Sequence, residues 1–224
     1  MILWSFPVVR APTVKLKKAR GRTNSQQRWL NRQLNDPYVS AAHEEGWRSR
    51  AAFKLIEMNK KNRIIPVGGN VVDLGAAPGG WSQVALKEKA GKVIGVDLLP
   101  VDKIPGAEII QGDFTDPDMP DKLRTLLNGG ADAVISDMAP NTTGHAKTDH
   151  IRIMALAELA LFFAEEILNP GGNFVAKVLQ GGSESELLNK LKKNFKTVKH
   201  VKPPASRKDS REMYVVALGY RRQE

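Results

Sequence analysis

The stretch VVDLGAAPGGW, residues 71–81, decides the fold. An apolar run reaches Asp73 and predicts a buried strand, and the glycine-rich segment after it predicts a tight turn. Gly75, Gly79 and Gly80 allow the backbone to bend and to approach a ligand without a side-chain clash. A helix beginning at the end of the stretch would point its N-terminus at that ligand. Strand, turn and helix together predict a Rossmann-like sheet with a ligand at the turn.

A second predicted strand, residues 93–96, is followed by Asp97, twenty-four residues after Asp73. A carboxylate there is placed to accept hydrogen bonds from the hydroxyls of a ribose. The turn reads G-A-A-P-G-G and lacks the G-x-G-x-x-G spacing that suits a dinucleotide pyrophosphate. S-adenosylmethionine has no phosphate and carries a cationic sulfonium, which suits this turn and the acidic residue before it. The alternative is an ordinary tight turn, but strand, turn, helix and second acidic strand end all agree.

The rest of the chain alternates strand and helix, which is typical of a mostly parallel sheet covered by helices on both faces. We expect seven strands, near residues 71–74, 93–97, 107–110, 132–136, 173–178, 197–202 and 213–219. We expect helices near 25–34, from Pro37 with Asp36 as its N-cap, and near 48–60, 81–89, 119–128, 149–168 and 184–194. The loop before the last strand is too short for a crossover helix, so that strand should run antiparallel. Residues 23–224 should form a single domain.

Charge and composition restrict the class of partner. The chain has 224 residues, no cysteine and a net charge of +10, which excludes disulfides and cysteine nucleophiles. Residues 1–54 hold eleven Lys/Arg and three Asp/Glu, so this quarter carries most of the excess positive charge. A basic N-terminal region predicts a polyanionic substrate, with residues 1–22 as a flexible basic leader; a merely solvated tail is the alternative. The apolar runs are too short to span a bilayer, so we expect no membrane partner.

Four charged residues are candidates for chemistry. Asp137 ends the fourth strand, where carboxylates face the ligand crevice of a parallel sheet; the alternative is a helix N-cap. Lys177 lies within a covered strand, where burial and a nearby cation would lower its pKa and let it act as a general base. The alternative is a lysine that reaches solvent from the strand end. Glu212 opens the final strand and Lys54 lies in mid-helix, and each alone would pass for a surface charge.

Several segments together resemble one known family. They are SRAAFKL at 49–55, DLGAAPGGWSQ at 73–83, DLLP at 97–100, QGDF at 111–114, SDMAPN at 136–141 and SRK at 206–208. They resemble the FtsJ (RrmJ) family of S-adenosylmethionine-dependent RNA 2′-O-ribose methyltransferases over about residues 24–220. Within that family the nearest resemblance is to the enzymes that methylate a uridine ribose of bacterial large-subunit ribosomal RNA, and to their mitochondrial counterparts.

The resemblance implies a class I methyltransferase fold and a set of site residues. It assigns a catalytic tetrad to Lys54, Asp137, Lys177 and Glu212, with Lys177 as the general base, Lys54 lowering its pKa and the two carboxylates orienting the lysines. It assigns contacts with S-adenosylmethionine to Gly79, Trp81, Asp97, Asp113 and Asp137. No metal is implied. The implied partner is large-subunit ribosomal RNA, and we expect the protein to be a monomer. From the charge of residues 1–54, we expect basic side chains of the N-terminal region to help hold RNA phosphates, namely Lys15, Lys17, Lys18, Arg28 and Arg32.

Competing hypotheses differ in what they leave unexplained. An NAD(P)-dependent oxidoreductase would share the turn and Asp97, but would not need the tetrad or the basic arm. An exocyclic-amine methyltransferase would need an aromatic residue to stack a flipped base, and Asp137-Met138-Ala139-Pro140 offers none. Another RNA such as transfer RNA, or a non-catalytic role in ribosome assembly, remains open. We expect a cytoplasmic location, with the mitochondrial matrix as the alternative if the leader is a transit peptide.

Overall fold

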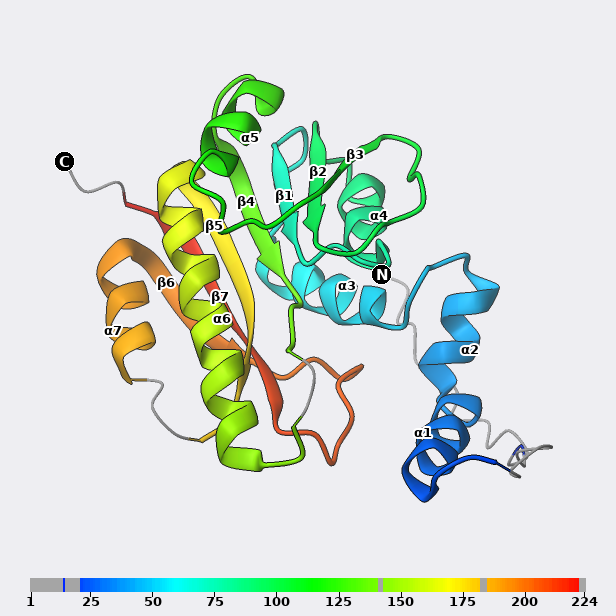
Figure 1. Cartoon of the computed structure of the whole chain (residues 1–224). Coiled ribbons are helices and arrows are strands. Elements are labelled where there is room, and N and C mark those ends of the chain that lie inside the picture. Colours follow the sequence, from blue (N-terminus) through cyan, green and yellow to red (C-terminus); the bar gives the residue numbers. More distant parts are fainter. Residues whose placement is uncertain (1–13, 15–20, 141–142, 182–184, 222–224) are drawn as a thin grey trace.

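A computed structural model of the protein describes residues 14, 21–140, 143–181 and 185–221. Seven strands form one sheet in the order β3-β2-β1-β4-β5-β7-β6 (Figure 1). The strands are β1 (Val71–Leu74), β2 (Val93–Asp97), β3 (Ala107–Gln111), β4 (Ala131–Ser136), β5 (Leu168–Leu179), β6 (Phe195–Val201) and β7 (Glu212–Tyr220). Nearly all of the predicted basic leader, including Lys15, Lys17 and Lys18, lies outside the described residues.

The strand directions confirm the predicted fold class. Strands β1 to β5 pair in parallel, whereas β7 pairs antiparallel with both β5 and β6. The chain therefore forms a Rossmann-like, mostly parallel sheet with an antiparallel final strand. Strand β7 enters between β5 and β6, so the short loop before it makes a hairpin at the sheet edge, as the sequence predicted.

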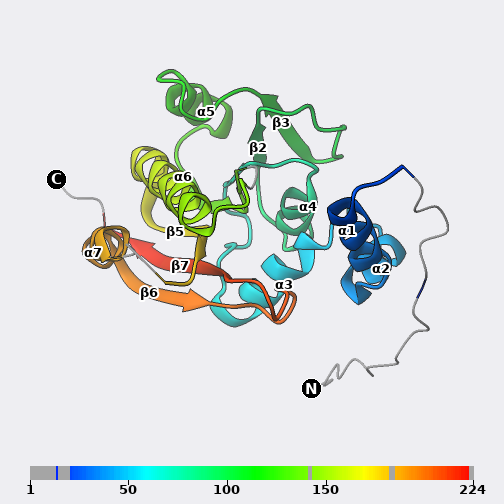
Figure 2. The same ribbon diagram turned by 60° about the horizontal axis from the view of Figure 1, so that its bottom comes forward.

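Seven helices accompany the sheet within the described part of the chain. They are α1 (Asn24–Leu34), α2 (Pro37–Glu44), α3 (Ala51–Asn62), α4 (Gly80–Lys87), α5 (Met119–Leu127), α6 (Ala146–Ile167) and α7 (Ser185–Asn194). Figure 2 shows α5, α6 and α7 on one face of the sheet and α3 and α4 on the other. Both faces are covered, which explains why the strands read as nearly continuous apolar runs rather than as alternating ones.

Two predicted boundaries differ from the structure for identifiable reasons. Strand β5 begins at Leu168 rather than at 173, because Leu168 pairs with Ala131 before an irregularity in the ladder. Helix α3 begins at Ala51 rather than at 48. The preceding Arg48 lies outside the helix, where its backbone N–H donates a hydrogen bond to the side chain of Gln83 at 2.9 Å. The spacing of apolar residues in a sequence does not reveal hydrogen bonds between a helix end and a side chain that is distant in the chain.

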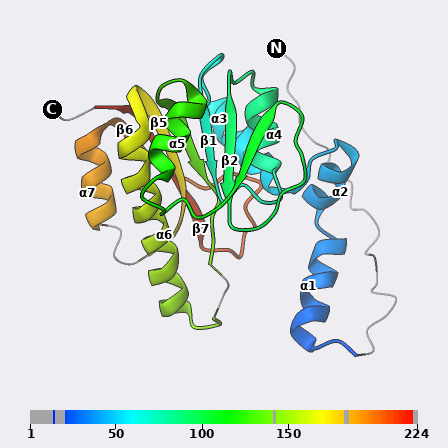
Figure 3. The same cartoon turned by 45° about the horizontal axis from the view of Figure 1, so that its top comes forward.

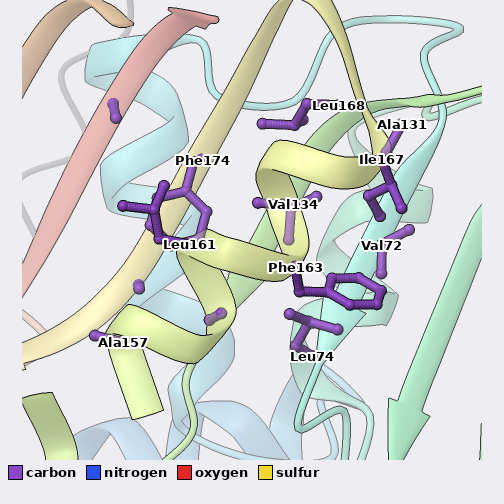
Figure 4. Close-up of a cluster of buried hydrophobic side chains, with 14 of the residues drawn as sticks. Val72, Leu74, Ala131, Val134, Ala157, Leu161, Phe163, Ile167, Leu168 and Phe174 are labelled. Atoms are coloured by element: carbon purple, nitrogen blue, oxygen red, sulfur yellow. The ribbon is translucent and has the colours of Figure 1, made fainter. Parts of the chain in front are cut away.

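The larger core lies between the sheet and α6. Phe163, Leu161 and Ile167 of α6 meet Val72 and Phe174 of the sheet (Figure 4). Burying a side chain of this size stabilises the fold by about 1.5–3 kcal/mol relative to leaving it exposed. In the described segments no helix is both long enough and apolar enough to cross a bilayer.

Helices α1 and α2 form an arm beside the sheet (Figure 3). A capping box at Thr23 and Gln26 starts α1, and Asp36 caps α2 ahead of Pro37, as the sequence predicted. The ring of Tyr38 on α2 packs 5.4 Å, between centroids, from Phe53 on α3. The arm therefore continues into the helix that carries Lys54.

Candidate active site

The four candidate catalytic residues come from four elements and meet at one point. Lys54 projects from α3, Asp137 follows β4, Lys177 lies in β5 and Glu212 opens β7. The ladder between β4 and β5 pairs Ser136 with Ala176, which brings the next residue of each strand together. The antiparallel ladder between β5 and β7 places the start of β7 beside the end of β5. Residues far apart in sequence therefore converge at the carboxyl end of the sheet.

Lys177 lies at the centre of the cluster. Its Nζ is 2.9 Å from Asp137 Oδ1 and 3.7 Å from Glu212 Oε2. The same Nζ donates a hydrogen bond to the backbone carbonyl of Asp137 at 2.7 Å. Its side chain is only 10% exposed, so this is not a lysine that reaches into bulk solvent. The alternative role of Asp137 as a helix cap is also wrong, because α6 begins nine residues later, at Ala146.

Lys54 is the second buried cation. Its Nζ lies 2.7 Å from Glu212 Oε1 and 3.9 Å from Asp137 Oδ1, and it donates to the hydroxyl of Tyr214 at 3.1 Å. Each lysine therefore contacts both carboxylates. Two cations and two anions balance within the cluster, which reduces the cost of removing them from water.

Tyr214 is a fifth member that the sequence analysis missed. Its hydroxyl donates to Asp137 Oδ1, and its side chain is fully buried. Burial and the nearby carboxylates of Asp137 and Glu212 raise its pKa, which keeps the phenol neutral as a donor. A signal was present: Tyr214 is two residues after Glu212 in a strand, so both side chains point to the same face.

The pKa of Lys177 corrects one sequence-based expectation. Burial lowers the pKa of this lysine, as predicted, but the carboxylates of Asp137 and Glu212 outweigh burial, and the pKa is raised above its ordinary value. Burial likewise raises the pKa of Glu212, but Lys54 and Lys177 reverse this and leave it lowered. The expected net lowering of the Lys177 pKa was wrong for the resting site, because the sequence could not show how closely two carboxylates approach this lysine.

The glycine turn lies next to this cluster. Gly75 and Gly79 have φ angles of +74° and +110°, where residues other than glycine are strained. A Cβ atom at Gly75 would collide with the side chain of Met138, which follows Asp137. At Gly79 it would collide with Ile104. Glycine is thus needed for packing as well as for backbone shape, and the turn is fitted directly against the segment that carries Asp137.

Asp97 is placed as predicted, at the end of β2 beside the turn. Its Oδ2 accepts from the backbone N–H of Ala77, and its Oδ1 from that of Leu99, both at 2.8 Å. A carboxylate oxygen can accept two hydrogen bonds, so both oxygens keep capacity for a ribose. Asp97 therefore fixes the turn and offers acceptors at the same time.

Asp113 follows β3 at the same edge of the sheet. Its Oδ1 accepts from the backbone N–H and the hydroxyl of Thr115, at 2.9 and 2.7 Å. These bonds lower the pKa of Asp113 and hold the carboxylate in a fixed orientation. Its Oδ2 makes no hydrogen bond within the described chain, and so could accept from a ligand.

Trp81 is placed differently from a cofactor-lining side chain. Its indole Nε1 donates to the backbone carbonyl of Ala51 at 2.8 Å, and its ring packs 5.7 Å from that of Tyr214. The side chain is buried and links α4 to α3. A contact between Trp81 and a cofactor would have to come from its backbone N–H in the first turn of α4.

Asp73 is a buried residue of β1, two positions before the first glycine of the turn. Burial raises its pKa to about 7, while the hydroxyl of Ser82, which donates at 2.7 Å, opposes the shift. The negative charges of Asp137 and Asp97 raise this pKa further. Among the described residues, Asp73 and Asp97 have no lysine or arginine partner, whereas the carboxylates of the neighbouring cluster contact two lysines.

The Rossmann-like sheet, with the glycine turn and the cluster of lysines and carboxylates at its carboxyl edge, defines the architectural class. Comparison with known proteins gives the family. The family described as FtsJ-like methyltransferase matches residues 47–220, which is most of the chain. The protein therefore belongs to the FtsJ-like methyltransferase family, and it is a methyltransferase.

Individual relatives agree with this assignment. A Gluconobacter oxydans protein named ribosomal RNA large subunit methyltransferase E is 65% identical over 212 residues, covering 95% of this chain and 79% of the relative. A protein of the same name from Granulibacter bethesdensis is 64% identical over 212 residues, covering 95% and 92%. A crystal structure described as a ribosomal RNA methyltransferase of Plasmodium falciparum superposes with a TM-score of 0.69 at 32% identity, over 78% of this chain and 98% of that one.

Proposed function

We propose that this protein transfers a methyl group from S-adenosylmethionine to the 2′-hydroxyl of a ribose, in a uridine of large-subunit ribosomal RNA. One observation carries the proposal: two lysines and two carboxylates from four elements surround one point beside the glycine turn. A hydroxyl is a weak nucleophile that must lose a proton as it is methylated. A preformed cluster that can hold and move a proton is what that chemistry requires.

The residues around the turn fit S-adenosylmethionine. Asp97 offers acceptors for ribose hydroxyls and Asp113 offers one for the adenine edge. Asp73 and Asp97 have no cationic side-chain partner among the described residues, and carboxylates without such a partner favour a cationic ligand. When bound, the cofactor would supply an electrophilic methyl group on its sulfonium. Gly79 and the backbone N–H of Trp81 would let the chain approach it closely.

Lys177 is the proposed proton acceptor. Asp137 holds its Nζ through both carboxylate and backbone carbonyl, so the lysine is fixed before substrate binds. Because its pKa is raised, the resting site favours the ammonium form. Lys177 must therefore release a proton before it accepts that of the 2′-hydroxyl, and kcat/KM should rise with pH through the alkaline range. Alignment of the hydroxyl for in-line transfer would supply a further part of the acceleration.

Large-subunit ribosomal RNA is proposed as the substrate on two grounds. The bacterial relatives carry that substrate in their name. The arm formed by α1 and α2 exposes Arg28 and Arg32, and continues into the helix that supplies Lys54. We propose that the arm is an RNA-binding part of a single methyltransferase domain, residues 23–224. A monomer in the bacterial cytoplasm is the accompanying proposal.

Loss of the gene tests the substrate directly. Mapping 2′-O-methyl groups in ribosomal and transfer RNA should show one missing methyl group, on a uridine of the large-subunit RNA. Loss from transfer RNA instead would support the alternative substrate. An unchanged methylation map with defective subunit assembly would support a non-catalytic role. Purified protein, labelled S-adenosylmethionine and large subunits from the deletion strain should restore the methyl group, and free RNA in parallel shows whether assembly is required.

A further inference from the structure

A basic cleft lies between the α1–α2 arm and the loop joining β6 to β7. Its volume is about 410 Å³, within the usual range for small-ligand sites. Its charged lining residues are Arg32, Asp36, Arg50, Arg207, Lys208 and Asp209. Four cations against two carboxylates leave an excess positive charge. Figure 2 shows the loop between β6 and β7 reaching toward the side of the molecule that carries α3 and the arm.

Asp36 organises the cations of this cleft. The carboxylate is nearly buried, and its Oδ2 lies 3.0 Å from Arg50 Nε and 3.2 Å from Arg207 Nη2. Arg50 is held within the protein, because its Nη2 also donates to the backbone carbonyl of Ala205 at 2.6 Å. One anion thus anchors two arginines, from the start of α3 and from the distant loop.

The remaining cations are free to bind a ligand. In the described parts of the chain, neither Arg32 nor Lys208 makes a side-chain hydrogen bond or ion pair, and both are exposed. Arg207 uses Nε and Nη2 on Asp36, while its Nη1 makes no hydrogen bond to the described chain. A guanidinium held on one edge presents its other donors in a fixed fork, which is the geometry that suits a phosphate.

The same loop also contacts the reaction centre. Ser206, next to Arg207, donates from its hydroxyl to Glu212 Oε1 at 3.0 Å. Ala205 donates its backbone N–H to Glu57 Oε2 on α3 at 2.7 Å. A group bound in the cleft would therefore lie against a segment that also supports the tetrad.

We propose that this cleft binds a phosphodiester group of the RNA strand that carries the target ribose. Arg32, Arg207 and Lys208 supply the donors, and Asp36 is the residue that positions Arg207. The inference rests on the proposed function for the identity of the strand. To that function it adds an anchor for the substrate that is built by the folded part of the chain, in addition to the basic residues of the N-terminal sequence.

Salt dependence of RNA binding tests the cleft without requiring methyl transfer. Arg32→Gln and Lys208→Gln remove exposed cations that have no partner to lose, so folding should be unaffected. Binding of a labelled, uridine-rich single-stranded RNA is measured by anisotropy against salt concentration. Each lost phosphate contact should reduce the magnitude of the slope of log K against log salt by about 0.7. At 0.1 M salt this corresponds to a loss of affinity of roughly fivefold. The double variant should lose roughly 25-fold, with unchanged affinity for S-adenosylmethionine.

The matched control is Lys122→Gln, an exposed lysine of α5, which should leave slope and affinity at wild-type values. Wild-type slopes in both cleft variants, with normal methylation by the wild type, would overturn the cleft and leave the proposed function standing. An equal loss in Lys122→Gln would also overturn it, because attraction would then be diffuse. Loss confined to the cleft variants, with no methylation by the wild type, would support the cleft and overturn the proposed function.

Discussion

Two carboxylates in this protein, the partly buried Glu212 and the fully buried Asp73, have pKa values shifted in opposite directions. Burial raises both, but Glu212 has two lysines within 4 Å and its pKa is lowered. Among the described residues, the side chain of Asp73 has only the hydroxyl of Ser82 as a side-chain partner, and burial raises the pKa of Asp73 to about 7. Burial alone therefore does not determine the charge of a site. The partners that the fold brings to it do.

The difference separates the roles of the two regions. In the reaction centre the charges are balanced by neighbours within the protein, so the cluster is assembled before substrate arrives. Around the glycine turn, the carboxylates of Asp73 and Asp97 have no cationic side-chain partner in the described part of the chain, and the region favours a cation brought in from outside. Each of the following predictions tests one side of this contrast.

The largest effect is expected for Lys177→Met. The substitution keeps an unbranched side chain but removes the proton acceptor, so the single-turnover rate should fall roughly 10²- to 10⁴-fold. S-adenosylmethionine should bind with near wild-type affinity in calorimetry, because the turn is intact. Lys122→Met on α5 is the control. Methylation at wild-type speed would show that the lysine is not the base and that the reaction rests on alignment.

Asp73→Asn should change the pH dependence of stability. Because the folded pKa is raised, the folded protein retains a proton between pH ~4 and ~7 that the unfolded chain has lost, so the free energy of unfolding falls as pH rises through this window. The total is at most about 4 kcal/mol, from 1.36 kcal/mol per pKa unit. Urea unfolding should show the asparagine variant to be more stable near pH 8, with no difference near pH 4.

Glu212→Gln should change the free energy of unfolding in the opposite direction from Asp73→Asn, in the same urea measurement. Because the pKa of Glu212 is lower in the folded protein, its ionised carboxylate stabilises the fold at pH values above the pKa of the unfolded chain. This stabilisation is lost as the pH falls through the pKa of the folded protein. This variant should therefore be less stable than wild type at neutral pH, with the difference shrinking in acid. If both variants shifted stability in the same direction, the contrast between the two regions would be refuted.

Asp97→Ala should weaken cofactor binding more moderately. It removes acceptors for the ribose and for two backbone N–H groups, so the affinity for S-adenosylmethionine should fall by ~1–3 kcal/mol. Calorimetry gives this value directly. Asp102→Ala, an exposed carboxylate in the loop after β2, should leave the affinity unchanged. Equal affinities for wild type and Asp97→Ala would remove Asp97 from the site.

The smallest effect is expected for the pH profile of Lys54→Met. Removing this cation leaves Lys177 facing the carboxylates with less opposing charge, so its pKa should rise further. The alkaline limb of kcat/KM should move to higher pH, and the plateau rate should also drop. A limb that stays in place would show that Glu212 shields Lys177 from Lys54.

The sequence was sufficient for the fold and for naming the candidate residues. The glycine turn at 75–80 and the apolar strands depend on local backbone geometry and on period, both of which are written in consecutive residues. The short link before β7 likewise predicted its antiparallel direction. The segment boundaries around Arg48 and Leu168 were less accurate, because side-chain ties and a ladder irregularity set them.

Only the tertiary structure decided the electrostatics. The sequence predicted a lowered pKa for Lys177, but its raised pKa depends on Asp137 at 2.9 Å and Glu212 at 3.7 Å, contacts made across strands and far apart in the chain. The contacts of Tyr214 with the tetrad and of Asp36 with two arginines likewise join residues far apart in the chain. A Coulomb interaction depends on distance and surroundings, and residue order specifies neither until the chain has folded.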